Sequence, residues 1–202
     1  MKKILAVMGS PRRDGNTNTI LDRLIFGAKE AGVDCEKVDL NTLKMSPCIE
    51  CGGCNETGIC IIKDDMTPIY QKIATADWVI LASPIFFYNI TSRTQALIER
   101  SQACWAGKYL LKRGPYGGRR RKGIFISLGA TKGKLLFDGV TRTVRYFFDA
   151  IDADFEGALL YRGIDTKGAI NKHPSALNEA QELGGCVARG DDVSNLPYLY
   201  RP

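Results

Sequence analysis

Short apolar runs alternate with helix-like segments along most of this chain. The first run, KILAVM at residues 3–8, ends at turn residues and is followed from about Thr17 by apolar side chains at helical spacing. A second strand is predicted over residues 33–40, and the runs WVILAS at 78–83 and GIFISLG at 123–129 repeat the strand signal. Their nearly continuous apolar character is typical of parallel strands that are buried on both faces.

Helices are predicted between and after these strands. They cover about residues 64–75, 91–103, 135–150 and 174–188, and a fifth strand is expected near residues 155–161. Five strand–helix alternations predict an α/β fold with a doubly wound parallel sheet. Because ligands in such sheets bind at the carboxyl ends of the strands, we expect function in the loops that follow the first, third and fourth strands.

The length of 202 residues suits one α/β domain. We expect this single domain over residues 1–190, with a cysteine loop at 47–63 after the second strand and a tail at 191–202. The first apolar run is too short for a secretion signal and lacks a cleavage site. No segment approaches the roughly 20 apolar residues that span a bilayer. These features predict a cytoplasmic protein that does not use a membrane as a partner.

A basic run, Arg119 to Lys122, holds part of the net charge of +6. Short charge runs most often form solvated loops, which is the first interpretation here. A basic edge that steers acidic redox partners or a cofactor phosphate is the second. Nucleic acid is not an expected partner, because no recognition helix or aromatic-interleaved basic strand accompanies the run.

Residues 9–19, GSPRRDGNTNT, connect the first strand to the first helix. The N-terminus of a helix presents unpaired N–H groups to an anion, and this loop adds hydroxyl, amide and guanidinium donors. The segment lacks the lysine placement of a Walker A loop and the G-x-G-x-x-G of dinucleotide folds. It therefore predicts a phosphate site for a ligand other than ATP or NAD. A capped helix start that binds no ligand is the alternative.

Four cysteines within thirteen residues form the most specific motif in the chain. Cys48, Cys51, Cys54 and Cys60 follow the spacing C-x2-C-x2-C-x5-C. Structural zinc sites usually place two C-x2-C pairs across a longer insert, whereas successive x2 spacings suit an iron–sulfur cluster. We therefore expect these cysteines to ligate a [4Fe-4S] cluster. An empty, zinc-filled or disulfide-forming loop stays open as the alternative.

The other potentially reactive side chains carry no comparable signal. Cys35, Cys104 and Cys186 fall in predicted strands and helices, where a small buried hydrophobic role is expected. His173 is the single histidine and precedes a proline, and no Ser-His-Asp set is identified. No catalytic side chain is predicted.

Three features resemble those of the NADPH-dependent FMN reductase and iron–sulfur flavoprotein group. They are the segment GSPRRDGNTNT at residues 9–19, the cysteine spacing and the segment SPIFFYNITS at residues 83–92. The resemblance covers about residues 1–130 well and the rest only in broad pattern. It implies a flavodoxin-like sheet with five strands in the order 2-1-3-4-5. It also implies that FMN is bound by three loops, through Ser10, Arg12, Asn16, Thr17, Asn18, Thr19, Pro84, Ile85, Phe86, Phe87, Asn89, Thr91, Ser127, Leu128 and Gly129.

This resemblance implies an FMN-dependent oxidoreductase that transfers electrons between a [4Fe-4S] cluster and FMN. A flavin exchanges one or two electrons and a cluster exchanges one, so the pair can couple the two kinds of transfer. The implied electron donor is ferredoxin or NAD(P)H, the acceptor is a small molecule, and the implied assembly is a homodimer or homotetramer.

Two other functions stay open. The first is an NAD(P)H-dependent FMN or quinone reductase in which the cysteine loop is structural. The second is a flavodoxin-like electron carrier or redox sensor whose loop chemistry changes partner binding.

Overall fold

A five-stranded parallel sheet forms the centre of the computed structural model, which describes residues 2–201. The strands run in the order β2-β1-β3-β4-β5, and every neighbouring pair is parallel. This order confirms the flavodoxin-like fold expected from the sequence. The strands are β1 (Ile4–Met8), β2 (Cys35–Asp39), β3 (Trp78–Ala82), β4 (Arg121–Gly129) and β5 (Ala153–Arg162).

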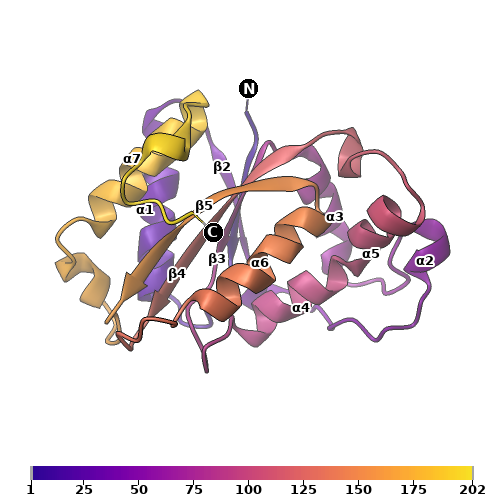
Figure 1. The fold of residues 1–202 in the computed structure, drawn as a ribbon, viewed down its shortest axis with the longest axis horizontal. Coiled ribbons are helices and arrows are strands. Elements are labelled where there is room, and N and C mark those ends of the chain that lie inside the picture. The colour runs from indigo at the N-terminus through magenta and orange to yellow at the C-terminus, as the bar shows by residue number, and fades with distance from the viewer. Residues whose placement is uncertain (1, 202) are drawn as a thin grey trace.

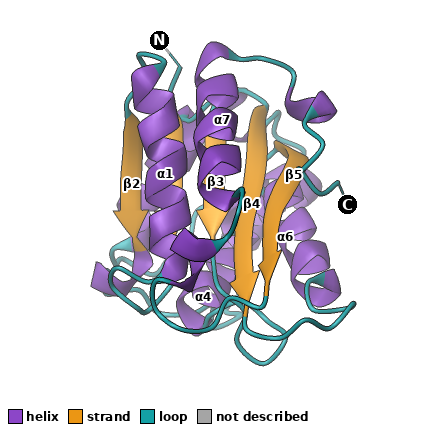
Figure 2. Ribbon diagram, turned by 90° about the vertical axis from the view of Figure 1, so that its left-hand side faces the viewer, coloured by secondary structure: helices purple, strands orange, loops and turns teal. Residues whose placement is uncertain are grey.

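Helices cover both faces of the sheet, as Figures 1 and 2 show. One face carries α1 (Asn16–Glu30) and α7 (Ala176–Arg189), and the other carries α3 (Met66–Thr75), α4 (Ser92–Arg100) and α6 (Asp138–Ala150). Two one-turn helices, α2 (Cys54–Thr57) and α5 (Gln102–Trp105), lie beyond α4 at the edge of the molecule. None of the helices within residues 2–201 is long and apolar enough to cross a membrane.

Side chains that point alternately to the two faces of the sheet explain why both faces are apolar. In β1, Leu5 and Val7 pack in the core beneath α3, α4 and α6, whereas Ile4, Ala6 and Met8 pack in the core beneath α1 and α7. Successive side chains of a strand point to opposite faces, so a strand covered on both faces must be apolar throughout. The continuous apolar runs in the sequence therefore become buried central strands.

Helices α1 and α7 approach so closely that glycine is required at their contact. A Cβ atom on Gly27 would lie 2.0 Å from the carbonyl oxygen of Gln181, and one on Gly184 would lie 1.9 Å from that of Leu24. These two glycines let the helix backbones touch. The contact holds the second half of α1 against α7.

The basic run at residues 119–122 is only in part the solvated loop that its composition suggested. Arg121 and Lys122 begin β4. Arg121 is only 2% exposed, and its guanidinium donates hydrogen bonds to the carbonyl oxygens of Ile151 and Tyr116. Its neighbours pair with carboxylates: Arg119 with Asp77, Arg120 with Asp154 and Lys122 with Glu156. Arg119 and Arg120 thus stay in an exposed loop, whereas Arg121 is a buried cation at the start of β4.

The segment after α7 packs back onto the sheet. Val193 and Leu199 are buried, and Tyr200 exchanges two backbone hydrogen bonds with Ala158 of β5. This pairing protects the outer edge of β5.

Candidate functional site

A cavity of about 100 Å³ lies at the carboxyl ends of the strands. It is lined by the segments that follow β1, β3, β4 and β5, which is the edge where a doubly wound sheet binds ligands. Nine of the fifteen predicted FMN-binding residues line this cavity: Ser10, Arg12, Asn16, Thr17, Pro84, Ile85, Phe86, Leu128 and Gly129. All three loops that the sequence singled out thus meet at one place.

The phosphate loop, defined as residues 9–19, leads into an uncapped helix. Gly15 is the N-cap of α1, and no side chain accepts a hydrogen bond from the first turn of the helix. The buried Thr17 and the guanidinium-bearing Arg12 both line the cavity beside this helix end. An uncapped helix N-terminus with added hydroxyl and cationic donors suits a phosphate group.

Gly9 brings this loop close to the neighbouring segment. A Cβ atom on Gly9 would lie 1.9 Å from the Oγ1 atom of Thr94, at the start of α4. The Gly9 backbone N–H also donates a 2.7 Å hydrogen bond to the carbonyl oxygen of Ala82, the last residue of β3. A larger residue at position 9 would therefore push the loop after β1 away from α4.

The loop after β5 also borders the cavity, which the sequence interpretation missed. Ile164 and Asp165 line the cavity with Ala130. Asn16 Nδ2 donates a 2.8 Å hydrogen bond to the carbonyl oxygen of Thr166 across the phosphate loop. The rule that ligands bind at carboxyl ends applies to β5 as well, so that rule could have identified this fourth segment.

Asn18 and Thr19 lie outside the cavity. Asn18 Nδ2 donates to Asp22, and Asn18 Oδ1 accepts from Lys37, both on the exposed surface of the molecule. Thr19 donates its hydroxyl to the Gly15 carbonyl oxygen within α1. Both residues lie on α1 and bond to neighbouring protein groups.

The segment after β3 forms a two-residue hairpin turn with an aromatic tip. Phe86 and Asn89 exchange two backbone hydrogen bonds, of 2.7 and 2.9 Å. Between them, Phe87 and Tyr88 have φ angles of 49° and 60°. Such turns usually contain Asn and Gly, because the left-handed region costs other residues about 1–2 kcal/mol each. Phe86 lines the cavity, whereas Phe87 is fully exposed to solvent.

Thr91 and Ser127 are buried behind the cavity and connect its walls. Thr91 donates its hydroxyl to the Gly9 carbonyl oxygen, and Ser127 donates its hydroxyl to the Ser83 carbonyl oxygen at 2.8 Å. These contacts join neighbouring segments of the carboxyl edge. Together with Asn18, Thr19, Phe87 and Asn89, they are the predicted FMN residues that do not line the cavity.

The cysteine loop folds so that Cys48, Cys51, Cys54 and Cys60 border one small cavity of about 30 Å³. Burial first, and then the nearby Cys60, Cys48 and Cys51, raise the pKa of the Cys54 thiol, which reflects how close the four groups lie. Four thiols are a donor set that suits an iron–sulfur cluster or zinc. Within residues 2–201, however, no three Cys, His, Asp or Glu side chains are arranged to hold a metal ion. The donor chemistry fits a cluster, and ligation would require the thiols to converge further.

The three other cysteines are separate from this loop. Cys104 and Cys186 are buried, as expected for small core residues, and Cys35 is half-buried. Burial raises the pKa of Cys104 to about 12 and, with a smaller effect from Asp34, that of Cys35 to about 11. These thiols are protonated near neutral pH and are poor nucleophiles.

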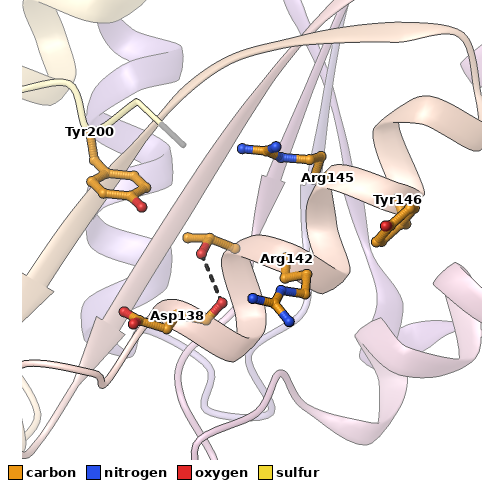
Figure 3. Close-up of a pocket in the computed structure, with 6 residues that line it drawn as sticks. Asp138, Arg142, Arg145, Tyr146 and Tyr200 are labelled. Carbon is orange, nitrogen blue, oxygen red and sulfur yellow. Dashed lines mark hydrogen bonds between the residues drawn. The ribbon is translucent and has the colours of Figure 1, made fainter.

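A larger cavity of about 410 Å³ lies between α6 and the C-terminal segment (Figure 3). Asp138, Arg142, Arg145 and Tyr146 of α6 border it together with Tyr200. No residue of the phosphate loop or the cysteine loop reaches it. Size alone therefore does not identify the site, and the convergence of loops at the carboxyl edge favours the smaller cavity.

Comparison with known proteins identifies relatives of this chain. The model of the NADPH-dependent FMN reductase family matches residues 2–132. An iron–sulfur flavoprotein of Methanosarcina thermophila is 32% identical over 130 residues, which is 64% of this chain and 64% of that protein. An iron–sulfur flavoprotein of Methanocaldococcus jannaschii is also 32% identical over 130 residues, covering 64% of this chain and 63% of the relative. The chain thus spans just under two thirds of the length of each relative.

Solved structures share the fold. An FMN-dependent NADH-azoreductase of Bacillus anthracis, solved in complex with FMN, superposes with a TM-score of 0.69. The alignment covers 93% of this chain and all of that protein, at 14% sequence identity. At this identity the likeness concerns the architecture of the chain.

Proposed function

The chain belongs to the NADPH-dependent FMN reductase family, and we propose that it is an FMN-dependent oxidoreductase that also carries a [4Fe-4S] cluster on its cysteine loop. The observation that carries the flavin assignment is the cavity at the carboxyl edge, where the uncapped N-terminus of α1 lies beside Arg12 and Thr17. When bound, FMN supplies hydride or single-electron transfer and the cluster supplies single-electron transfer.

The phosphate end of FMN is proposed to bind at α1. The backbone N–H groups of the first turn, the Thr17 hydroxyl and the Arg12 guanidinium would donate to its oxygens. Asn16 and Arg12 also donate to carbonyl oxygens of the loop after β5, Asn16 at 2.8 Å and Arg12 at 3.4 Å. That loop would hold these donors in place around the phosphate.

Apolar groups from the other segments are proposed to hold the ring system. Pro84, Ile85 and Phe86 after β3, and Leu128 and Gly129 at the end of β4, line the cavity. They would exclude water from one side of a planar ligand. The volume of about 100 Å³ is smaller than the roughly 300–1,000 Å³ of whole small-molecule sites, so this cavity would enclose part of an FMN molecule.

The cluster assignment is supported by the four thiols around one cavity and by the names of the relatives. Cys48, Cys51, Cys54 and Cys60 would be the ligands. Gly52 and Gly58, with φ angles of 72° and 66°, let the loop turn between them. We favour a cluster over the disulfide alternative because all four cysteines border the same cavity.

The electron donor is proposed to be NAD(P)H or a reduced ferredoxin, and the acceptor a small molecule. The family name supports a nicotinamide donor, whereas a cluster supports a one-electron donor. We also propose a homodimer or homotetramer, because the exposed Phe87 tip lies directly beside the cavity residue Phe86.

Two measurements test this function. The flavin-free chain should bind FMN at least tenfold more tightly than riboflavin, since riboflavin lacks the phosphate that α1 would hold. Equal affinity for both would contradict the phosphate site. Anaerobic mixing of the loaded protein with NADPH, NADH or reduced ferredoxin then identifies the donor by the rate of flavin bleaching. Rapid bleaching by NADPH in a protein without iron would favour the plain reductase.

A further inference from the structure

Arg100, the last residue of α4, is a charged side chain buried beneath the cysteine loop. It is only 1% exposed. An unpaired buried cation would be strongly destabilising, so such a residue must have partners. Asp64 supplies the opposite charge, at 2.7 Å from one guanidinium nitrogen and 3.1 Å from the other.

The same guanidinium joins both ends of the cysteine loop. Arg100 Nη1 donates to the carbonyl oxygen of Ser46, two residues before Cys48, at 3.0 Å. Its Nη2 donates to the carbonyl oxygen of Ile62, two residues after Cys60, at 3.2 Å. Asp64 also contacts the start of the loop directly, since it accepts a 3.0 Å hydrogen bond from the Ser46 backbone N–H. The loop that carries all four thiols is thus closed at its base by one ion pair.

Counting the donors of Arg100 leaves one N–H group free. A guanidinium has five N–H groups, and the two on Nη1 and the two on Nη2 match the four acceptors on Asp64, Ser46 and Ile62. The remaining donor, on Nε, is buried and has no partner among the described residues. Arg100 lines the same small cavity as the four cysteines. A buried donor without a partner needs an explanation, and the cysteines that line the same cavity are potential acceptors.

We propose that Arg100 is a positioning residue for the iron–sulfur site: it fixes the two ends of the cysteine loop and directs its free N–H to a sulfur of the cluster. This inference rests on the proposed cluster. A hydrogen bond from a cation to a cluster sulfur stabilises the more negative, reduced state and so raises the reduction potential. Lysine cannot reproduce the role, because an ammonium lacks the planar fork and the Nε donor.

Arg100→Lys is the direct test, with Arg113→Lys as the matched control. Arg113 is exposed and donates a 2.7 Å hydrogen bond to the Thr57 carbonyl oxygen, so it contacts the same loop from outside without lining the cavity. Both variants and the wild-type chain are reconstituted anaerobically with iron and sulfide. Three readouts follow: amide hydrogen exchange of residues 46–62 in the metal-free chain, the rate of iron loss to a chelator, and the reduction potential of the cluster.

In Arg100→Lys we expect faster exchange across residues 46–62, iron loss about tenfold faster than in the wild type, and a more negative potential. Arg113→Lys should match the wild type in all three. FMN binding reports folding, because the flavin cavity shares no residue with this one. If Arg100→Lys fails to bind FMN, the double variant Arg100→Gln/Asp64→Asn takes its place, because it removes both buried charges together. It must then show the faster exchange, the faster iron loss and the more negative potential.

If the wild type loads iron and Arg100→Lys shows unchanged exchange, iron loss and potential, the role of Arg100 is overturned and the proposed cluster still stands. A wild type that takes up no iron and sulfide overturns the proposed cluster. Faster exchange in Arg100→Lys would then reveal a purely structural arginine, and the inference would fall with the cluster.

Discussion

The hydroxyl of Thr91 donates a 2.6 Å hydrogen bond to the carbonyl oxygen of Gly9. This contact joins the segment after β3 to the phosphate loop, although the two residues are 82 positions apart. Thr91 is also the N-cap of α4, where its side chain accepts a 3.4 Å hydrogen bond from the Thr94 N–H. One buried hydroxyl therefore joins two walls of the cavity at the carboxyl edge.

Replacing Thr91 by valine removes these two hydrogen bonds, and a third one of 2.9 Å between the Thr91 and Thr94 hydroxyls, at nearly constant volume. The free energy of unfolding should fall by about 1–2 kcal/mol, the usual contribution of an N-cap and a buried hydrogen bond. Thr91→Ser, which keeps the hydroxyl, should retain most of the stability. Urea denaturation compares the two variants, and equal stability of the valine and serine forms would disprove the role of the hydroxyl.

Thr17 and Asn18 are neighbours in the sequence with different surroundings. Thr17 is buried at the cavity, whereas Asn18 bonds to Asp22 and Lys37 on the surface. Thr17→Val should weaken FMN binding about tenfold or more, because a hydrogen bond to a charged group contributes about 1.5–3 kcal/mol. Asn18→Ala should leave the dissociation constant unchanged. Fluorescence titration with FMN measures both, and a larger loss in Asn18→Ala would reverse the assignment.

The strained hairpin tip offers a test of stability without flavin. Phe87 and Tyr88 both occupy the left-handed region, with φ angles of 49° and 60°. Replacing them together by Asn and Gly should raise the free energy of unfolding by about 1–2 kcal/mol, since these residues favour such turns. Thermal unfolding of the flavin-free chain measures the change. A loss of stability would mean that the aromatic side chains stabilise the fold by contacts within one chain.

The Asp64–Arg100 pair predicts a pH dependence of stability. Burial alone would raise the pKa of the Asp64 carboxyl, but hydrogen bonds from Arg100 and from the Ser46 and Met66 backbone lower that pKa below its ordinary value. The folded pKa is therefore below the unfolded value of about 3.9. The carboxylate stabilises the fold fully above about pH 4, and this contribution is lost as the pH falls through the folded pKa.

Asp64→Asn should consequently be less stable than the wild type at pH 7, by an amount that shrinks below about pH 4. Denaturation curves at pH 7 and pH 3 measure the two differences. A difference that stays constant between these pH values would show that the Asp64 charge does not contribute to stability.

The parallel sheet and the location of the site follow from patterns within the chain, whereas the strand order was implied by the family resemblance. Continuous apolar runs such as WVILAS predicted buried parallel strands, and their carboxyl ends placed Ser10, Pro84 and Leu128 at one edge. Local spacing did not predict contacts made by distant residues. The pairing of Asn16 with Thr166 joins positions 150 residues apart.

Burial was the other property that composition could not predict. Arg121 belongs by composition to a solvated basic run, yet at the start of β4 its side chain is buried and donates to the carbonyl oxygens of Ile151 and Tyr116. Arg100 likewise carries no signal in a helix of mixed polarity, because its partners Ser46 and Ile62 lie on a loop 38 or more residues away. Only the folded chain shows that these cations are enclosed.

Stoichiometry on one anaerobically purified sample tests the central claim most directly. FMN, iron and acid-labile sulfide are assayed together with the ultraviolet–visible spectrum. We predict one FMN and about four irons and four sulfides per chain, as expected for one [4Fe-4S] cluster beside one flavin. Flavin bands without iron or sulfide after anaerobic reconstitution would contradict the cluster, and a chain that binds no FMN would contradict the account as a whole.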